Sequence, residues 1–282
     1  MLLTGAYGFV GQCISPVLAE HFELMKAPPY DEVTGEGLDL SDSSATRQLM
    51  KDIAPNVVVH LAALKNIARC EREPEAAWTA NVQTTRNLLP ADSTKGPHMV
   101  FLSSDYVFDG QEGGYTDLDF PQPATVYGQT KRQAELLVLQ AGGTVVRSGG
   151  LYGPAHQPGV LFSWAIEQLQ QNQKIEAFTN VFNSPTYVND LATALVQLCR
   201  HRPGGIYHAA GSDRLSRFEL LRLLAQRLGV NIELVQPSFC PKEANGGVEP
   251  GDLSLVCSRR SPLESVRLRG ASQVLADWPM TT

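Results

Sequence analysis

Met1-Leu2-Leu3-Thr4-Gly5-Ala6-Tyr7-Gly8-Phe9-Val10-Gly11 opens the chain and decides the fold that we expect. A short apolar segment runs into three glycines spaced three residues apart, and an amphipathic segment follows from Phe9 to Glu20. In such a loop Gly5 allows a tight turn, Gly8 lets the backbone approach a pyrophosphate, and Gly11 lets helix and strand pack closely. The helix then presents unpaired N–H groups to the anion. The stretch predicts a strand, a dinucleotide-binding loop and a helix; a glycine-rich turn that binds nothing is the alternative.

Apolar runs alternate with helical stretches along the first half of the chain. Val57–Leu61, Met99–Leu102 and Thr144–Arg147 are nearly continuous apolar runs, which is typical of strands buried on both faces. Helical stretches lie at residues 43–52, 73–89 and 124–140. This alternation implies a parallel sheet with helices on both faces and right-handed crossovers. We therefore expect an α/β fold of the Rossmann type, with a doubly wound parallel sheet.

The second half of the chain is less regular. Residues 149–158 are rich in glycine and proline and read as an irregular stretch. Further along, the pattern predicts helices at 161–172, 188–200 and 217–228 and a strand at 205–208. We expect residues 1–150 to form an NAD(P)-binding Rossmann domain. Residues 151–282 would form a smaller, interleaved α+β lobe that binds the substrate, within one compact unit.

Candidate functional residues follow three of the expected strands. Ligands of open parallel sheets bind beyond the carboxyl ends of the strands. This rule places Gly5–Gly11, Leu61–Leu64 and Ser103–Ser104 at one edge of the sheet, because each set comes directly after a strand. The cofactor and the reacting groups should therefore meet at that edge.

Tyr127-Gly128-Gln129-Thr130-Lys131 places a Tyr and a Lys four residues apart, on one face of an expected helix. A phenol ionises near about pH 10 in water, and a neighbouring ammonium lowers that pKa. With the Ser104 hydroxyl, such a pair can move a proton to or from a carbinol oxygen. Ser104, Tyr127 and Lys131 are therefore the candidate catalytic residues.

Composition excludes several classes of protein. The 282 residues are 43% hydrophobic and carry a net charge of −6, which argues against a general nucleic-acid-binding protein. No apolar run has the length of a membrane span, and an expected first strand at residue 2 leaves no room for a signal peptide. The five cysteines are scattered and the histidines show no ligand spacing, so we expect a reducing, cytoplasmic compartment and no metal.

The end of the second strand bears on the choice of cofactor. An NAD site usually has an acidic residue there, which binds the ribose 2′-hydroxyl. Here the strand is expected at residues 22–26, no carboxylate follows it directly, and Lys26 is near. This favours NADP(H), with NAD(H) as the alternative if Lys26 is only a solvated strand end. Asp39 can hydrogen-bond an adenine amino group or cap the helix that begins near Ser43.

Together these motifs resemble the extended short-chain dehydrogenase/reductases, and within them the dTDP-4-dehydrorhamnose reductase family. The resemblance rests on the glycine motif, His60–Ala63, Glu71–Ala77, Asn81, Leu102–Gly110 and Val126–Lys131. It implies that Ser104, in place of the family's Thr, acts with Tyr127 and Lys131 in catalysis. It also implies that Ser104 and Asp105 contact the substrate. One departure falls at Gly149 or Gly150, where the family often has a Trp that packs on the sugar.

The glycine motif, the sheet edge and the resemblance together give the expected cofactor contacts. These are Gly5, Gly8, Phe9, Val10, Gly11, Asp39, Leu40, Leu61, Ala62, Ala63, Leu102, Tyr127 and Lys131.

The resemblance implies an NAD(P)H-dependent reductase of a nucleotide-activated 4-keto-6-deoxy sugar. One alternative is a sugar-nucleotide epimerase or dehydratase with bound NAD. Another is a non-catalytic NADP-binding regulatory subunit, because Ser103–Gly110 also resembles the β subunit of methionine adenosyltransferase. The expected partner is a nucleotide-sugar substrate, and a homodimer is left open.

Overall fold

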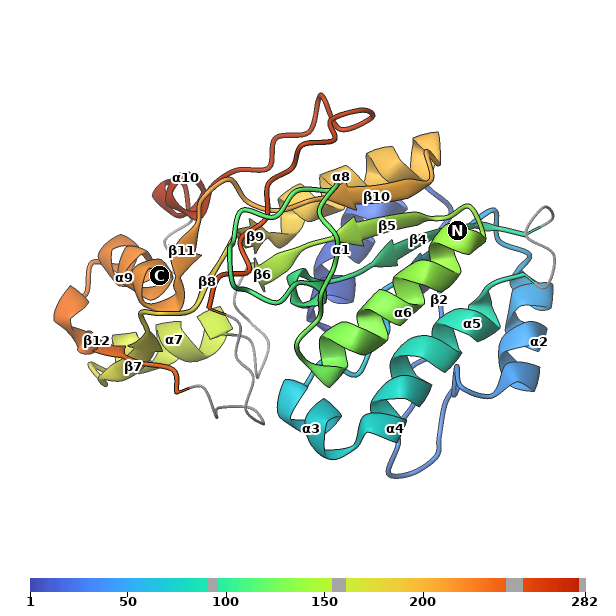
Figure 1. The fold of residues 1–282 in the computed structure, drawn as a ribbon, viewed down its shortest axis with the longest axis horizontal. Coiled ribbons are helices and arrows are strands. Elements are labelled where there is room, and N and C mark those ends of the chain that lie inside the picture. Colours follow the sequence, from blue (N-terminus) through green and yellow to red (C-terminus); the bar gives the residue numbers. More distant parts are fainter. Residues whose placement is uncertain (91–95, 154–160, 242–250, 279–282) are drawn as a thin grey trace.

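The computed structural model describes residues 1–90, 96–153, 161–241 and 251–278. Its centre is a parallel sheet of six strands in the order β10-β5-β4-β3-β1-β2 (Figure 1). These strands are β1 (Leu2–Thr4), β2 (Met25–Lys26), β3 (Val57–His60), β4 (His98–Leu102), β5 (Thr144–Arg147) and β10 (Gly205–His208). The predicted α/β fold with a Rossmann-type parallel sheet is confirmed.

Helices cover both faces of this sheet because its strands are apolar on both sides. Val57 and Val59 of β3 pack in one cluster with α1 (Phe9–Ala19) and α8 (Val188–His201). Val58, between them, belongs to a second cluster with α2 (Ser43–Ile53), α5 (Thr84–Leu88) and α6 (Val126–Gln140). Side chains alternate across a strand, so consecutive valines serve opposite helical layers.

The helix expected at residues 73–89 is interrupted. It consists of α4 (Pro74–Trp78), a π-helical turn at Thr79–Gln83, and α5. Short π-helical turns inside helices are rare and frequently occur at functional sites. A separate helix, α3 (Ile67–Arg72), precedes Pro74 and was not predicted. The sequence therefore indicated the helical region but not its break or its π turn.

Residues beyond 150 build a second, smaller core. It includes Tyr152, Phe162 and Leu221 and lies at the end of the molecule where α9 and α10 are labelled in Figure 1. Its helices are α7 (Leu161–Gln170), α9 (Arg217–Leu228) and α10 (Ala271–Ala276). The short strand pairs are β7 (Ile175–Phe178) with β12 (Val235–Ser238), and β8 (Phe182–Asn183) with β11 (Leu215–Ser216). A short 3-10 turn at Ile232–Leu234 also lies in this part of the chain. A second one, at Asp105–Val107, follows β4 of the large sheet.

Two findings revise the expected layout. Residues 149–152 were expected to be irregular, but Gly149–Tyr152 forms strand β6, which pairs with β9 (Pro185–Tyr187); the rest of that stretch, 154–158, lies outside the described residues. The large sheet also takes β10, and its helical layer takes α8, from beyond residue 150. The two parts of the chain are thus interleaved, and the division at residue 150 stays a prediction. In the described part of the chain, no helix is both long and apolar enough to span a bilayer.

Candidate active site

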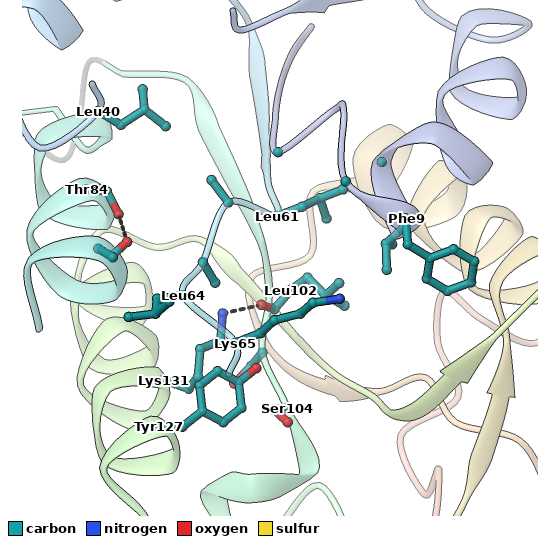
Figure 2. Close-up of a pocket in the computed structure, with 18 of the residues that line it drawn as sticks. Phe9, Leu40, Leu61, Leu64, Lys65, Thr84, Leu102, Ser104, Tyr127 and Lys131 are labelled. Carbon is teal, nitrogen blue, oxygen red and sulfur yellow. Dashed lines mark hydrogen bonds between the residues drawn. The ribbon is translucent and has the colours of Figure 1, made fainter. Parts of the chain in front are cut away.

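A cavity of about 890 Å³ lies at the carboxyl edge of the large sheet (Figure 2). Its lining includes every residue that the sequence proposed for cofactor, substrate or proton transfer. These are Gly5, Gly8, Phe9, Val10, Gly11, Asp39, Leu40, Leu61, Ala62, Ala63, Leu102, Ser104, Asp105, Tyr127 and Lys131. Lys26, which favoured NADP(H), does not belong to the described lining. The topology therefore brings the predicted residues to one place, while their roles remain predictions.

The three loop glycines meet different demands. Gly5 has a φ of +67°, and a Cβ there would lie 2.7 Å from the Ala62 nitrogen. A Cβ on Gly11 would lie 2.2 Å from the Gly5 carbonyl oxygen, so helix and loop touch there. At Gly8 the nearest protein atom to a Cβ would be 3.6 Å away, and this residue precedes α1 as its N-cap without a side-chain hydrogen bond. Packing thus requires Gly5 and Gly11, while Gly8 leaves room at a helix N-terminus for an anion.

Ser104 and Asp105 lie buried where β4 leaves the sheet. Ser104 Oγ donates a hydrogen bond to Asp105 Oδ1 at 2.8 Å and accepts one from the Tyr106 N–H. Burial raises the pKa of Asp105 to about 7, although the Ser104 hydrogen bond opposes the shift. A Cβ on Gly149 would lie 2.0 Å from Asp105 Oδ2, so a glycine at 149 makes room for this carboxyl group.

Tyr127 stands in the first turn of α6. Thr125 caps this helix by accepting a hydrogen bond from the Gly128 N–H at 3.1 Å. Burial raises the pKa of the Tyr127 phenol, and a hydrogen bond with the Ser104 side chain opposes that rise. We expected Lys131 to lower this pKa, and that expectation is wrong for the protein alone. Tyr127 therefore keeps its proton at neutral pH.

Lys131 bonds a backbone carbonyl group of the sheet. Its Nζ donates to the Leu102 carbonyl at 2.7 Å, as the dashed line in Figure 2 shows, and lies 3.9 Å from the centroid of the Phe101 ring. Burial lowers the pKa of Lys131 to about 7, against the raising effect of the Glu135 charge. The lysine is thus anchored to the end of β4.

Glu135, one turn further along α6, ties this helix to the sheet. It accepts hydrogen bonds from Ser103 Oγ at 2.7 Å and from Arg147 Nε and Nη2 at 2.8 Å. The side chains of Glu135 and Arg147 are fully buried. Burial disfavours the ionised form of Glu135, but the bonds and charge of Arg147 outweigh it and lower its pKa. This pair fixes Ser103, the neighbour of Ser104.

Asn81, in the π-helical turn, is a second anchor. Its Oδ1 accepts from the Leu64 N–H at 2.8 Å, and its Nδ2 donates to the Leu64 carbonyl and to Thr130 Oγ1. Thr130 in turn donates to the Tyr127 carbonyl at 2.8 Å. Asn81 was noted in the family pattern without a role, and the structure shows that it joins the loop after β3 to the helix that carries Tyr127.

His60 is a core residue and does not line the cavity. Its Nδ1 lies 2.6 Å from Thr4 Oγ1, and its Nε2 lies 3.1 Å from Thr85 Oγ1. Thr85 donates its own proton to the Asn81 carbonyl, so Nε2 must be the ring nitrogen that carries hydrogen. Burial and the Lys131 charge lower the pKa of His60 to about 3, which makes it a neutral structural residue.

Sequence patterns missed several charged residues that line the cavity. Glu32 and Arg69 line the cavity and form an ion pair, with Arg69 Nη2 at 2.7 Å from Glu32 Oε2. Lys65 also lines it. These residues lie in loops and in an unpredicted helix, and only the proximity of Lys65 to Leu61–Leu64 pointed toward the site. Among the residues that the structure describes, no group of three metal-ligating side chains is found.

Comparison with known proteins places the chain in a family. A family model described as the RmlD substrate binding domain matches residues 1–269. The chain belongs to this family. The predicted resemblance is thereby confirmed, since its relatives include dTDP-sugar reductases. A dTDP-4-keto-6-deoxy-D-glucose reductase from Streptomyces niveus is 29% identical over 254 residues, which cover 88% of this chain and 85% of that protein.

Two further similar proteins bear on the function and the fold. Methionine adenosyltransferase 2 subunit beta from Xenopus tropicalis is 29% identical over 272 residues, covering 92% of this chain and 80% of that protein. The crystal structure of dTDP-4-dehydrorhamnose reductase from Bacillus anthracis in complex with NADP has a TM-score of 0.87. The two structures match over 98% of this chain and 97% of the reductase, at 23% sequence identity. At that identity the match supports the fold alone.

Proposed function

We propose that this protein is an NAD(P)H-dependent reductase of a nucleotide-activated 4-keto-6-deoxy sugar. The observation that carries the proposal is the meeting of Ser104, Tyr127 and Lys131 in the cavity that also contains the glycine loop. The reductase named among the relatives supports the substrate class. A cytoplasmic location and a homodimer stay predictions.

The cavity fits a dinucleotide. Gly8 leaves room for a pyrophosphate, and the N–H groups at the start of α1 have no side-chain cap to compete with it. Leu40, Ala62 and Leu102 would supply apolar contacts for the rings, and Asp39 would approach the adenine. A reduced nicotinamide, once bound, supplies hydride-transfer chemistry.

The chain's own groups would handle the proton. Tyr127, with a raised pKa, is protonated at neutral pH and can give its proton to the oxygen of a reduced carbonyl group. Ser104 would hold that oxygen by hydrogen bonding. Lys131, bonded to the Leu102 carbonyl, would bind the cofactor ribose and stabilise the phenolate after proton loss. The raised pKa of Tyr127 thus keeps the phenol in the protonated form that a general acid requires.

One assay separates the proposed classes of function. Purified protein is mixed with NADPH or NADH and dTDP-4-keto-6-deoxyglucose or dTDP-4-dehydrorhamnose, and both cofactor absorbance and sugar product are followed. Oxidation of the cofactor with formation of the 4-hydroxy sugar is expected. Sugar conversion without net oxidation would instead indicate an epimerase or dehydratase. Binding of cofactor without conversion of either sugar would contradict the reductase.

A regulatory role is the second candidate because a methionine adenosyltransferase 2 subunit beta, the kind of protein that Ser103–Gly110 resembles, is among the relatives at equal identity. That role requires a dinucleotide site but no proton donor. The described cavity retains both, since Ser104, Tyr127 and Lys131 accompany the glycine loop. We therefore rank reduction first.

A further inference from the structure

Lys65 differs from the other charged residues of the cavity. Six charged side chains line it in the described residues: Glu32, Asp39, Lys65, Arg69, Asp105 and Lys131. Five of them are engaged. Arg69 bonds Glu32 and Glu73, Asp39 bonds Ser41, Asp105 bonds Ser104, and Lys131 bonds the Leu102 carbonyl. No hydrogen bond or ion pair with another described residue is found for Lys65.

The backbone around Lys65 is nevertheless fixed. Asn81 binds both the N–H and the carbonyl of Leu64. On the other side, Asn66 caps α3 by accepting from the Arg69 N–H at 2.8 Å. A side chain held at its base and free at its tip can be aimed at a ligand with little loss of backbone entropy.

Figure 2 shows where the tip points. The Lys65 side chain extends across the cavity, in front of Leu102, with its amine directed to the side where Phe9 lies. Phe9 is the first residue of α1, at the helix terminus next to Gly8. Lys65 and the N-terminus of α1 therefore line the same cavity.

The charges that line the cavity indicate a role for the Lys65 cation. The described lining holds three carboxyl groups, and its other two cations are already bonded. Both ligands of the proposed reaction are diphosphate esters. A diphosphate in a cavity that also holds the Glu32 and Asp39 carboxyl groups is favoured by a positive charge that no carboxylate neutralises, and Lys65 supplies one.

We propose that Lys65 pairs with the diphosphate of a ligand in this cavity, and the direction of its amine favours the cofactor's diphosphate over that of the sugar nucleotide. The inference rests on the proposed function only for the identity of these ligands. It concerns binding and needs no turnover.

The test compares Lys65→Gln, Lys65→Arg and the wild type by calorimetric titration with NADPH and, separately, with dTDP. Lys174→Gln is the matched control, because it removes the same charge from an exposed lysine outside the described lining. Lys65→Gln should weaken the binding of one of the two ligands about tenfold, which is equivalent to about 1.4 kcal/mol. Lys65→Arg should bind both ligands within about threefold of the wild type, and Lys174→Gln should bind them as the wild type does.

Every outcome decides the question. Weaker binding of NADPH places Lys65 at the cofactor diphosphate, and weaker binding of dTDP places it at the sugar nucleotide. Equal binding of both ligands by Lys65→Gln and wild type, or a wild type that binds neither, overturns the proposal. A wild type that binds NADPH through Lys65 but reduces no keto sugar would contradict the reductase and leave the role of Lys65 intact.

Discussion

The two ends of the cavity are built in different ways. At the catalytic end Lys131 is 2% exposed, and Glu135 and Arg147 below it are fully buried, with hydrogen bonds of 2.7–2.8 Å. Beyond β2, Glu32 and Arg69 face each other with side chains 57% and 34% exposed. A buried ion pair holds its geometry because the loss of one partner is costly. An exposed ion pair contributes little to stability and is screened by salt. The catalytic end should therefore be rigid and the far end adaptable.

The largest expected effect is on stability. Glu135→Gln leaves Arg147 as a buried charge without its partner, so the free energy of unfolding should fall by about 3–5 kcal/mol. Glu32→Gln, which removes one partner of the exposed pair, should cost less than about 1 kcal/mol. Urea denaturation of both variants measures the contrast. Equal losses of unfolding free energy in the two variants would contradict the proposed difference between the buried and the exposed ion pair.

Next comes catalysis. Lys131→Met should lower kcat of the proposed reduction by about 100-fold or more, because the cation that would stabilise the Tyr127 phenolate is lost. Steady-state kinetics with NADPH and the keto sugar, on protein shown to be folded by circular dichroism, gives the value. A loss confined to KM would place Lys131 in binding and not in proton transfer.

The buried carboxyl group at the catalytic end should show itself in pH dependence. Because the pKa of Asp105 is raised to about 7 in the folded protein, ionising it costs stability as the pH rises from about 4 to 7. Asp105→Asn removes that cost, so its stability relative to the wild type should increase over this range, by on the order of 1 kcal/mol per pH unit. Thermal unfolding at several pH values tests this, and a difference that does not vary with pH would contradict it.

The smallest effect belongs to the far end. Arg69→Gln should change the affinity for NADPH by less than about threefold, and added salt should reduce even that change. Titration of wild type and variant at low and high salt gives the comparison. A tenfold or greater loss of NADPH affinity would contradict this expectation, because it would show that the exposed end of the cavity contributes strongly to cofactor binding.

The same contrast explains what the sequence could predict. The glycine loop, the strand ends and the Tyr127–Lys131 spacing are local patterns, and the rule for parallel sheets brings them together. The direction of the Tyr127 pKa shift could not be predicted, because it depends mainly on how deeply the folded chain buries the phenol, which the spacing along one helix does not reveal. Neither could β6, whose glycines gave no strand signal, or the Glu32–Arg69 pair, whose partners lie 37 residues apart.

The most direct test of the account is the reduction of a dTDP-4-keto-6-deoxy sugar by wild type and by Tyr127→Phe, followed as consumption of NADPH. Tyr207→Phe, which removes a phenol from a buried strand away from the cavity, is the control. We predict turnover by the wild type and the control, and a loss of about 100-fold or more in Tyr127→Phe, whose cofactor affinity should be retained. Activity of Tyr127→Phe within tenfold of the wild type, or a wild type without activity, would contradict the account.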